Sequence, residues 1–304
     1  MAEEKDRVEI NEVVLRDGLQ NEPDFVATEE KIRLADGLSR TGVRRLEVSS
    51  FVSPKAIPNL RDAADVLQGI TRVPGVRYTA LVPNVRGAER ALESSVDEVN
   101  LVMSIGERHN LANMRMTCDQ SLAQFKEIMT VIAGSGFFVN GTLATTFGCP
   151  FDGRQSVERV LWAIDIYREM GIEGITIADT IGVANPRQVG ELTTTIFRHH
   201  PDLPLTLHLH NTRDMGLANA LAAYDAGIRS FDSALGGIGG CPYAPGATGN
   251  VCTEDLVHMF HACGIDTGVD LSALIGLSCE LPALLGHATP GYVMKAGTSD
   301  RVYA

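Results

Sequence analysis

The chain has 304 residues, of which 44% are hydrophobic and 21% are charged, as in an ordinary folded globular protein. Its formal net charge of −12 argues against a general nucleic-acid or anionic-membrane binder, because such a protein needs a basic surface. No apolar run approaches the roughly 18 residues that a membrane-spanning helix needs. We therefore expect neither nucleic-acid nor membrane partners.

The chain has six cysteines, and no two of them form a Cys-x-x-Cys pair, which argues against a zinc ribbon or a thioredoxin-type site. So few cysteines are typical of a protein from a reducing compartment. The first residues are polar and acidic, and they lack the apolar stretch of a secretion signal. We expect a cytoplasmic protein.

Short apolar strands alternate with longer amphipathic stretches along the chain. Runs rich in β-branched and aromatic residues predict strands, and a proline in the first turn marks the start of one helix, at position 186. In chain order, the predicted strand–helix pairs are 8–15 with 29–39, 45–48 with 59–69, 77–82 with 84–94, 98–103 with 120–133, 137–147 with 157–170, 174–178 with 186–199, 205–210 with 215–226, and 228–235 with 254–263.

Eight successive strand–helix pairs predict parallel βαβ units in an α/β fold, and eight such units close most naturally into a single (β/α)8 TIM barrel. An open doubly wound sheet is the alternative, but the Gly-x-Gly-x-x-Gly turn after the first strand is missing. A further helical stretch at 271–285 predicts extra C-terminal helices outside the barrel. We expect one catalytic barrel domain over residues 1–304, with the barrel at about 8–265 and a C-terminal helical extension at about 270–290.

Two histidines, His208 and His210, end the seventh predicted strand. Functional residues of TIM barrels lie at the carboxyl ends of the strands. Residues two apart on a strand face the same side, so both imidazoles would project into the barrel mouth together. Such a pair suits a divalent metal, although two strand histidines bonded only to their neighbours remain an alternative.

Charged residues also end other predicted strands. Asp17 is a candidate anionic third ligand, with a turn residue before Gly18 as the alternative. Arg16 is placed to hold a carboxylate, a thioester oxygen or an enolate. Glu47 ends the second strand in an apolar context, and a buried carboxylate needs a partner, for which Arg16 is the candidate. Asp179 ends the sixth strand.

A glycine-rich loop precedes Cys241, with four glycines among the five residues before it. Such a loop is mobile or approaches a ligand closely, which exposes this cysteine to chemistry. We interpret Cys118, Cys252, Cys263 and Cys279 as small apolar packing residues instead. The glycines are weak evidence for a phosphate site, because no P-loop lysine follows them.

Six segments of the sequence, in this order, resemble the 3-hydroxy-3-methylglutaryl-CoA lyases, which belong to a larger group of metal-dependent barrel lyases and condensing enzymes. The similarity covers nearly the whole chain, and the Cys241 loop separates the lyases from the related synthases. The segments are 15–22 (LRDGLQNE), 49–55 (SSFVSPK), 147–153 (FGCPFDG), 179–183 (DTIGV), 208–210 (HLH) and 239–250 (GGCPYAPGATGN).

The resemblance implies cleavage of 3-hydroxy-3-methylglutaryl-CoA to acetyl-CoA and acetoacetate, with an acyl-CoA as substrate. It implies a divalent metal held by Asp17, His208, His210 and Asn250. Oxygen ligands with two imidazoles favour Mg²⁺ or Mn²⁺. The base that takes the hydroxyl proton is either Asp17, which counts among the catalytic residues, or a histidine–water relay.

The same resemblance assigns further roles. Arg16 matches the catalytic arginine, and Cys241 matches the catalytic cysteine that protonates the enolate carbon. Glu47 and Asp179 match additional active-site acids, and Gln20 matches a glutamine that binds substrate together with Arg16. The family also implies a homo-oligomer, a dimer or larger, that acts in leucine degradation.

Two positions depart from the family pattern, Asn211 where the lyases carry Asp and Pro23 where Lys is frequent. They leave citramalyl-CoA, or a longer branched 3-hydroxyglutaryl-CoA, as alternative substrates. A condensing synthase of the isopropylmalate type is less expected, because the Cys241 loop is present and no regulatory domain follows the barrel. A non-catalytic barrel is disfavoured, because all four predicted ligands are present.

Overall fold

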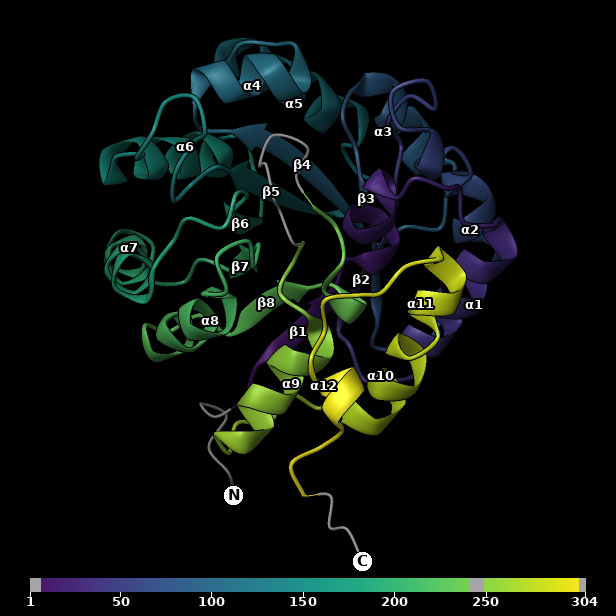
Figure 1. Ribbon diagram of the computed structural model, residues 1–304. Helices are drawn as coiled ribbons and strands as arrows, with labels where there is room; N and C mark the ends of the chain where they lie inside the picture. Colours follow the sequence, from purple (N-terminus) through teal and green to yellow (C-terminus); the bar gives the residue numbers. More distant parts are fainter. Residues whose placement is uncertain (1–6, 241–248, 301–304) are drawn as a thin grey trace, which may run out of the picture.

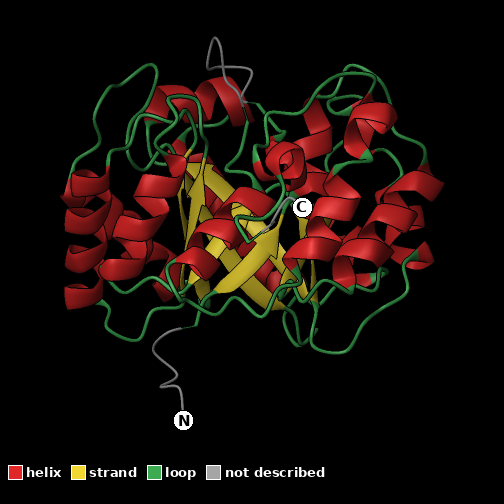
Figure 2. Ribbon diagram, turned by 60° about the horizontal axis from the view of Figure 1, so that its bottom comes forward, coloured by secondary structure: helices red, strands yellow, loops and turns green. Residues whose placement is uncertain are grey.

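The computed structural model describes residues 7–240 and 249–300. Within these residues, eight parallel strands pair in chain order and close into a barrel, since β8 returns to pair with β1. Helices surround the strands (Figure 2). The predicted TIM barrel is confirmed. Its strands are β1 Glu9–Glu12, β2 Arg45–Ser50, β3 Arg77–Leu81, β4 Glu98–Ser104, β5 Phe138–Ala144, β6 Gly174–Asp179, β7 Leu205–Leu209 and β8 Ser230–Ser233.

The helices that follow the strands mostly match the predicted ones. Several begin with a polar cap, as at Asn185, whose side chain accepts the N–H of Gln188. Every helix in the described part of the chain is too short or too polar to cross a bilayer. The helices are α1 Thr28–Ser39, α2 Ala63–Gly69, α3 Val85–Leu92, α4 Glu107–Met114, α5 Cys118–Val131, α6 Val157–Glu169, α7 Pro186–His199, α8 Gly216–Asp225 and α9 Thr253–Ala262.

Helix α4 has no counterpart among the predicted elements. Its buried residues are His109 and Asn110, so it lacks the apolar stripe from which a helix is predicted. The Asn110 side chain accepts the N–H of Ser104 and donates to Ser121 Oγ. Side-chain hydrogen bonds therefore fix this helix, and its hydrophobic pattern gives no sign of it.

The extra C-terminal helices are α10 Leu271–Ser278, α11 Leu281–Leu285 and α12 Val293–Ala296. Helices α10 and α12 pack beside α9, and α10 also packs beside α1 (Figure 1). The Asp255 carboxylate on α9 accepts the N–H groups of Tyr292 and Val293. The extension therefore continues past its predicted end near residue 290, because α9 holds α12 in place.

Strand β7 illustrates how the barrel divides apolar from polar side chains. Leu205, Leu207 and Leu209 belong to the hydrophobic core between strands and helices. Thr206 and His208 alternate with them and bond to side chains of the neighbouring β8. Because successive side chains of a strand point to opposite faces, the polar residues face the barrel interior. Burial of each leucine contributes roughly 1.5–3 kcal/mol.

Strand β1 is shorter than predicted. The chain leaves the sheet after Glu12, and Val14–Gly18 forms one π-helical turn whose successive N–H groups donate to the Val13 carbonyl. The Glu12 carboxylate accepts the N–H of the first residue of this turn, which directs the chain away from the strand. Arg16 and Asp17 therefore lie on a π-turn after β1, a local structure that is frequent at functional sites.

Candidate active site and metal centre

Three of the four predicted metal ligands meet at the carboxyl end of the barrel. Asp17 comes from the π-turn after β1, His208 from β7, and His210 directly follows β7. Their ligand atoms all lie within 4.8 Å of one another, and all three side chains are buried. Asp17 Oδ2 is 3.9 Å from His208 Nε2 and 3.7 Å from His210 Nε2.

Asn250, the fourth predicted ligand, lies against the same group. It pairs with His210 in an isolated bridge, and its Nδ2 donates to Asp17 Oδ2 at 2.7 Å. Asn250 Oδ1 and His210 Nδ1 are buried and have no hydrogen-bond partner among the described residues. Buried polar atoms without a partner are rare in native proteins and often mark an ion or water site. His210 faces Asp17 through Nε2, so the partnerless atom that suits a cation is Asn250 Oδ1. With this oxygen, the Asp17 carboxylate and two imidazoles, the four residues fit a divalent cation.

The charges of Asp17 and His210 suit a cation. Burial alone would raise the pKa of Asp17, but Arg16 and the two histidines outweigh it and hold the pKa at about 2. Burial lowers the pKa of His210 to about 4. Near neutral pH, Asp17 is then a carboxylate and His210 a neutral imidazole. These are the forms in which both groups bind metals.

Arg16 lies between two carboxylates, and its partnership with Glu47 is found as expected. Its Nε donates to Glu47 Oε2 at 2.6 Å, and its Nη1 donates to Asp17 Oδ1 at 2.5 Å. Burial opposes its charge, but the two carboxylates raise the pKa of Arg16 above its usual range. A fixed guanidinium next to the ligand cluster can stabilise a developing oxyanion.

A chain of amides and hydroxyls supports Glu47 from behind, and sequence reasoning missed it. Asn100 Nδ2 donates to Glu47 Oε1 at 3.2 Å. Asn100 Oδ1 accepts the Thr142 hydroxyl at 2.8 Å and Asn140 Nδ2 at 3.1 Å. Two donors on the oxygen fix the orientation of this amide, so its nitrogen must face Glu47. Asn140 also donates to Thr176 Oγ1. The sequence signal that could have revealed this series is the presence of asparagines within otherwise apolar strands.

Two other predicted site residues have local partners. Gln20 Nε2 donates to Asp17 Oδ1 at 2.9 Å. Both carboxylate oxygens of Asp179 accept backbone N–H groups, from Val183 and Ala184, each at 2.9 Å. Its carbonyl accepts the N–H of the second histidine of the cluster. Asp179 thus supports the loop after β6 beside the site, and its catalytic role stays a prediction.

The family model described as HMGL-like matches residues 7–279. The chain belongs to the HMGL-like family. Among the relatives of this HMGL-like protein is the (R)-citramalyl-CoA lyase of Chloroflexus aurantiacus, 44% identical over 95% of both chains. Another is the hydroxymethylglutaryl-CoA lyase YngG of Bacillus subtilis, 43% identical over 93% of this chain and 95% of that protein.

A solved structure extends the comparison. An HMG-CoA lyase from Acinetobacter baumannii, in complex with coenzyme A and 3-methylmalate, is 52% identical to this chain and superimposes with a TM-score of 0.96. The alignment covers 100% of this chain and 99% of that one. The resemblance stated from the sequence motifs is confirmed.

In this HMGL-like protein, Cys241 lies outside the described residues. The glycines before it can be placed: Gly239 has φ +101°, and a Cβ there would come within 2.5 Å of Asn250 Nδ2. Only glycine fits this position. Asn211 lies outside the ligand cluster, since its Oδ1 accepts the N–H of Gly216 at the start of α8. Pro23 is exposed.

One acid of the HMGL-like site was missing from the predicted set. Asp232 Oδ2 lies 3.3 Å from His208 Nδ1, and the two residues are partners in the register of β7 and β8. An acidic residue within a strand of the barrel was the signal for it, because a carboxylate removed from water requires a partner.

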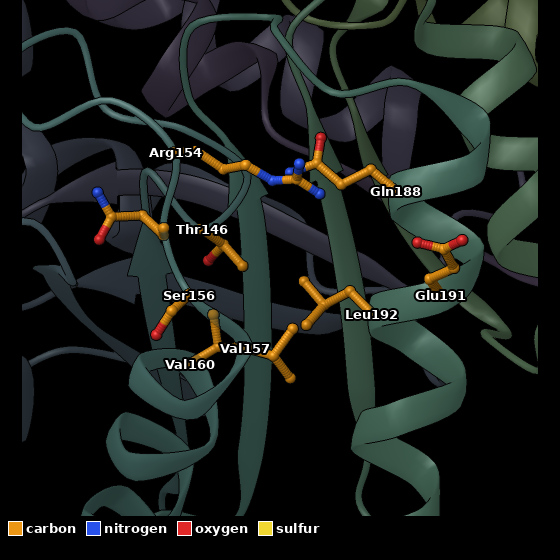
Figure 3. A pocket seen from close by; sticks show the side chains of 9 residues that line it. Thr146, Arg154, Ser156, Val157, Val160, Gln188, Glu191 and Leu192 are labelled. Carbon is orange, nitrogen blue, oxygen red and sulfur yellow. The ribbon is translucent and has the colours of Figure 1, made fainter.

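A separate surface hollow has a volume of about 310 Å³, and Figure 3 shows the side chains that line it. Its lining comes from the loop after β5, the start of α6 and one side of α7. Arg154 and Gln188 reach toward each other across it (Figure 3). None of the described candidate site residues of the HMGL-like protein lines this hollow.

Proposed function

We propose that this chain is a carbon–carbon lyase that cleaves 3-hydroxy-3-methylglutaryl-CoA to acetyl-CoA and acetoacetate. The observation that carries the proposal is the direct link between the two parts of the site: Asp17 faces both histidines through Oδ2 and binds Arg16 through Oδ1. A cation site and a fixed guanidinium are therefore adjacent. The relative from Bacillus subtilis that carries this activity in its name supports the assignment.

Asp17, His208, His210 and Asn250 would hold Mg²⁺ or Mn²⁺, which lowers the pKa of a coordinated substrate hydroxyl when bound. The hydroxyl proton passes to Asp17 or, through a water, to a histidine. The bond between C2 and C3 then breaks, and its electron pair moves into the acetyl-CoA enolate.

The chain's own residues act on that enolate. Arg16, held in place by Glu47, stabilises the negative charge on its oxygen, because a fixed donor needs no reorganisation as charge develops. Cys241 donates the proton that completes acetyl-CoA at the enolate carbon. Gln20 contacts the substrate beside Arg16, and Asp179 maintains the loop next to His210.

The second candidate function is cleavage of citramalyl-CoA to acetyl-CoA and pyruvate. The Chloroflexus aurantiacus relative, whose name states this activity, covers 95% of the chain, and the reaction needs the same cation and guanidinium. The two substrates differ in the groups around C3. A longer branched 3-hydroxyglutaryl-CoA requires the same chemistry.

Further parts of the proposal are less specific to the site. They are the choice of Mg²⁺ or Mn²⁺ over other cations, a homo-oligomeric state, a cytoplasmic location and a place in leucine degradation. The ligand chemistry supports the first, because carboxylate and amide oxygens suit hard cations. The small number of cysteines supports the cytoplasmic location. Family membership supports the oligomeric state and the place in leucine degradation.

A parallel product assay tests the proposal. Purified protein with Mg²⁺ or Mn²⁺ receives either 3-hydroxy-3-methylglutaryl-CoA or citramalyl-CoA, and acetoacetate and pyruvate are quantified, with EDTA as the control. Metal-dependent acetoacetate at the higher kcat/KM is the expected result. Dominant pyruvate would establish the second candidate, and neither product with metal bound would overturn both.

A further inference from the structure

The two histidines of the cluster differ in what holds their second ring nitrogen. His208 Nδ1 lies 3.3 Å from Asp232 Oδ2. His210 Nδ1 is buried and has no hydrogen-bond partner among the described residues. His210 is held through its backbone instead, since its N–H donates to the Asp179 carbonyl and it bridges to Asn250. Among the described residues, Asp232 therefore bonds to one imidazole of the pair, and the second ring nitrogen of the other has no such partner.

Asp232 is itself fixed on its other side. Asn11 Nδ2 donates to Asp232 Oδ1 at 2.9 Å and to Ser230 Oγ at 3.0 Å. Thr206 Oγ1 donates to the same Ser230 hydroxyl at 3.0 Å. These contacts join β7, β8 and β1 across the closing seam of the barrel. The carboxylate cannot turn away from His208 without losing the bond to Asn11.

The contact with Asp232 determines which ring nitrogen of His208 carries the proton and which carries the lone pair. A carboxylate oxygen accepts hydrogen bonds and donates none, so in the neutral imidazole the single ring proton must reside on His208 Nδ1. The lone pair then lies on Nε2, the atom that faces Asp17 Oδ2. A carboxylate behind an imidazole ligand also fixes the ring orientation and raises its basicity.

We propose that Asp232 is a positioning residue that selects the tautomer of His208 in which Nε2 can bind the cation, and thereby sets the cation affinity of the site. This inference rests on the proposed function, which requires the cation. It predicts that the two histidines respond differently to the loss of Asp232, although both belong to one cluster.

The test compares Asp232→Asn with wild type in Mn²⁺ titrations of the full chain, with free Mn²⁺ measured by EPR. We expect the Kd of Asp232→Asn to be about 10- to 100-fold higher. The matched control is Glu98→Gln. Glu98 is a buried barrel carboxylate that pairs with Arg45 and Arg77, so this variant also removes one negative charge. Its Kd should stay within about threefold of wild type.

A second readout needs no metal. Nitrogen-15 NMR of the metal-free protein at alkaline pH, where imidazoles are neutral, reports the tautomer of each histidine. We expect the proton of His208 on Nδ1 in wild type and a mixture of tautomers in Asp232→Asn. The signals of His210 should not change. Asn11→Leu releases the carboxylate without removing it, and should shift both readouts in the same direction by a smaller amount.

Wild-type Mn²⁺ affinity in folded Asp232→Asn would overturn the proposal. Equal weakening in Glu98→Gln would overturn it too, because the effect would then come from net charge. If Asp232→Asn does not fold, an unchanged Kd and tautomer in Asn11→Leu would have the same consequence. If wild type binds no Mn²⁺, the proposed function fails, and the tautomer of His208 alone decides whether Asp232 orients it.

Discussion

The two halves of the candidate site differ in how completely their polar groups are satisfied. In the arginine half, formed by Arg16, Glu47 and Asn100, each side chain bonds to the next in an unbroken series. In the histidine half, formed by His208, His210 and Asn250 around Asp17, His210 Nδ1 and Asn250 Oδ1 have no partner among the described residues.

This difference indicates how each half works. A guanidinium already held by carboxylates can stabilise new charge without rearrangement. A buried polar atom without a partner lowers the stability of the folded protein by about 1–3 kcal/mol. The histidine half carries this cost until a ligand binds. We infer that the arginine half is complete in the free protein, whereas in the histidine half the cation gives Asn250 Oδ1 the partner that it lacks.

Removal of one imidazole gives the largest expected effect. In His210→Ala, the Mn²⁺ affinity should fall by at least about 100-fold, and cleavage should be lost with it. Thermal unfolding measures this directly, because Mn²⁺ at 100 times its Kd should stabilise wild type by about 2.7 kcal/mol. The same Mn²⁺-dependent shift in the variant and in wild type would contradict the ligand assignment.

Removal of the guanidinium should separate the two halves. Arg16→Gln should lower kcat/KM by about 100- to 1,000-fold, because the developing enolate loses its fixed donor. Its Mn²⁺ affinity should change far less than that of His210→Ala. Arg33→Gln, which removes a half-exposed arginine from its surface ion pairs, is the control and should retain activity. A loss of affinity as large as the loss of turnover would show that Arg16 acts through Asp17.

Most of the fold was predictable because TIM barrels repeat one pattern. Alternating strand and helix signals located all eight strands, and the strand ends located the residues that the structure brings together around Asp17. The π-turn after β1 was not predictable, because a hydrogen bond from Val14 to the buried Glu12 carboxylate shapes it, and sequence periodicity does not record such a contact.

The residues that hold the site's side chains in place were less predictable than the site residues themselves. Asn100 and Asp232 become partners of Glu47 and His208 only through contacts between strands that are distant in sequence. A polar residue within a barrel strand signals the need for a partner, but the partner is set by strand register. The role of Cys241 falls outside the described residues and stays a prediction.

A smaller loss of turnover is expected when the hydrogen bond that supports Glu47 in the arginine half is removed. Asn100→Leu removes the amide behind Glu47, and should lower kcat about tenfold, equivalent to ~1.4 kcal/mol, with Mn²⁺ affinity unchanged. Steady-state kinetics and a Mn²⁺ titration measure the two quantities. Thr176→Val, at the far end of the same hydrogen-bonded series, should change kcat by less than about twofold. Equal effects of the two substitutions would contradict the specific support of Glu47.

A last effect concerns the stability of the fold and neither cation binding nor turnover: the free energy of unfolding should depend on pH through Glu12, which lies beneath the site. Burial, the largest cause, raises the pKa of Glu12 to about 8. Between the ordinary glutamate pKa of about 4.3 and this value, the folded state binds more protons than the unfolded state. The free energy of unfolding should therefore fall as the pH rises through this window, by less than about 1.4 kcal/mol per pH unit.

Urea unfolding at several pH values measures this slope, and Glu12→Gln should flatten it. The amide resembles the protonated acid. Protonated Glu12 can donate a hydrogen bond to the Thr253 hydroxyl, which in turn donates to Ser233 Oγ. An unchanged slope in Glu12→Gln would assign the pH dependence to other groups.

The alternation along β7 has a consequence for how such a protein diverges. Its leucines point to the helices and supply the packing, whereas Thr206 and His208 point inward and contribute polar contacts. Substitutions on the inner face can therefore alter reactivity with little effect on the packed layer that determines folding.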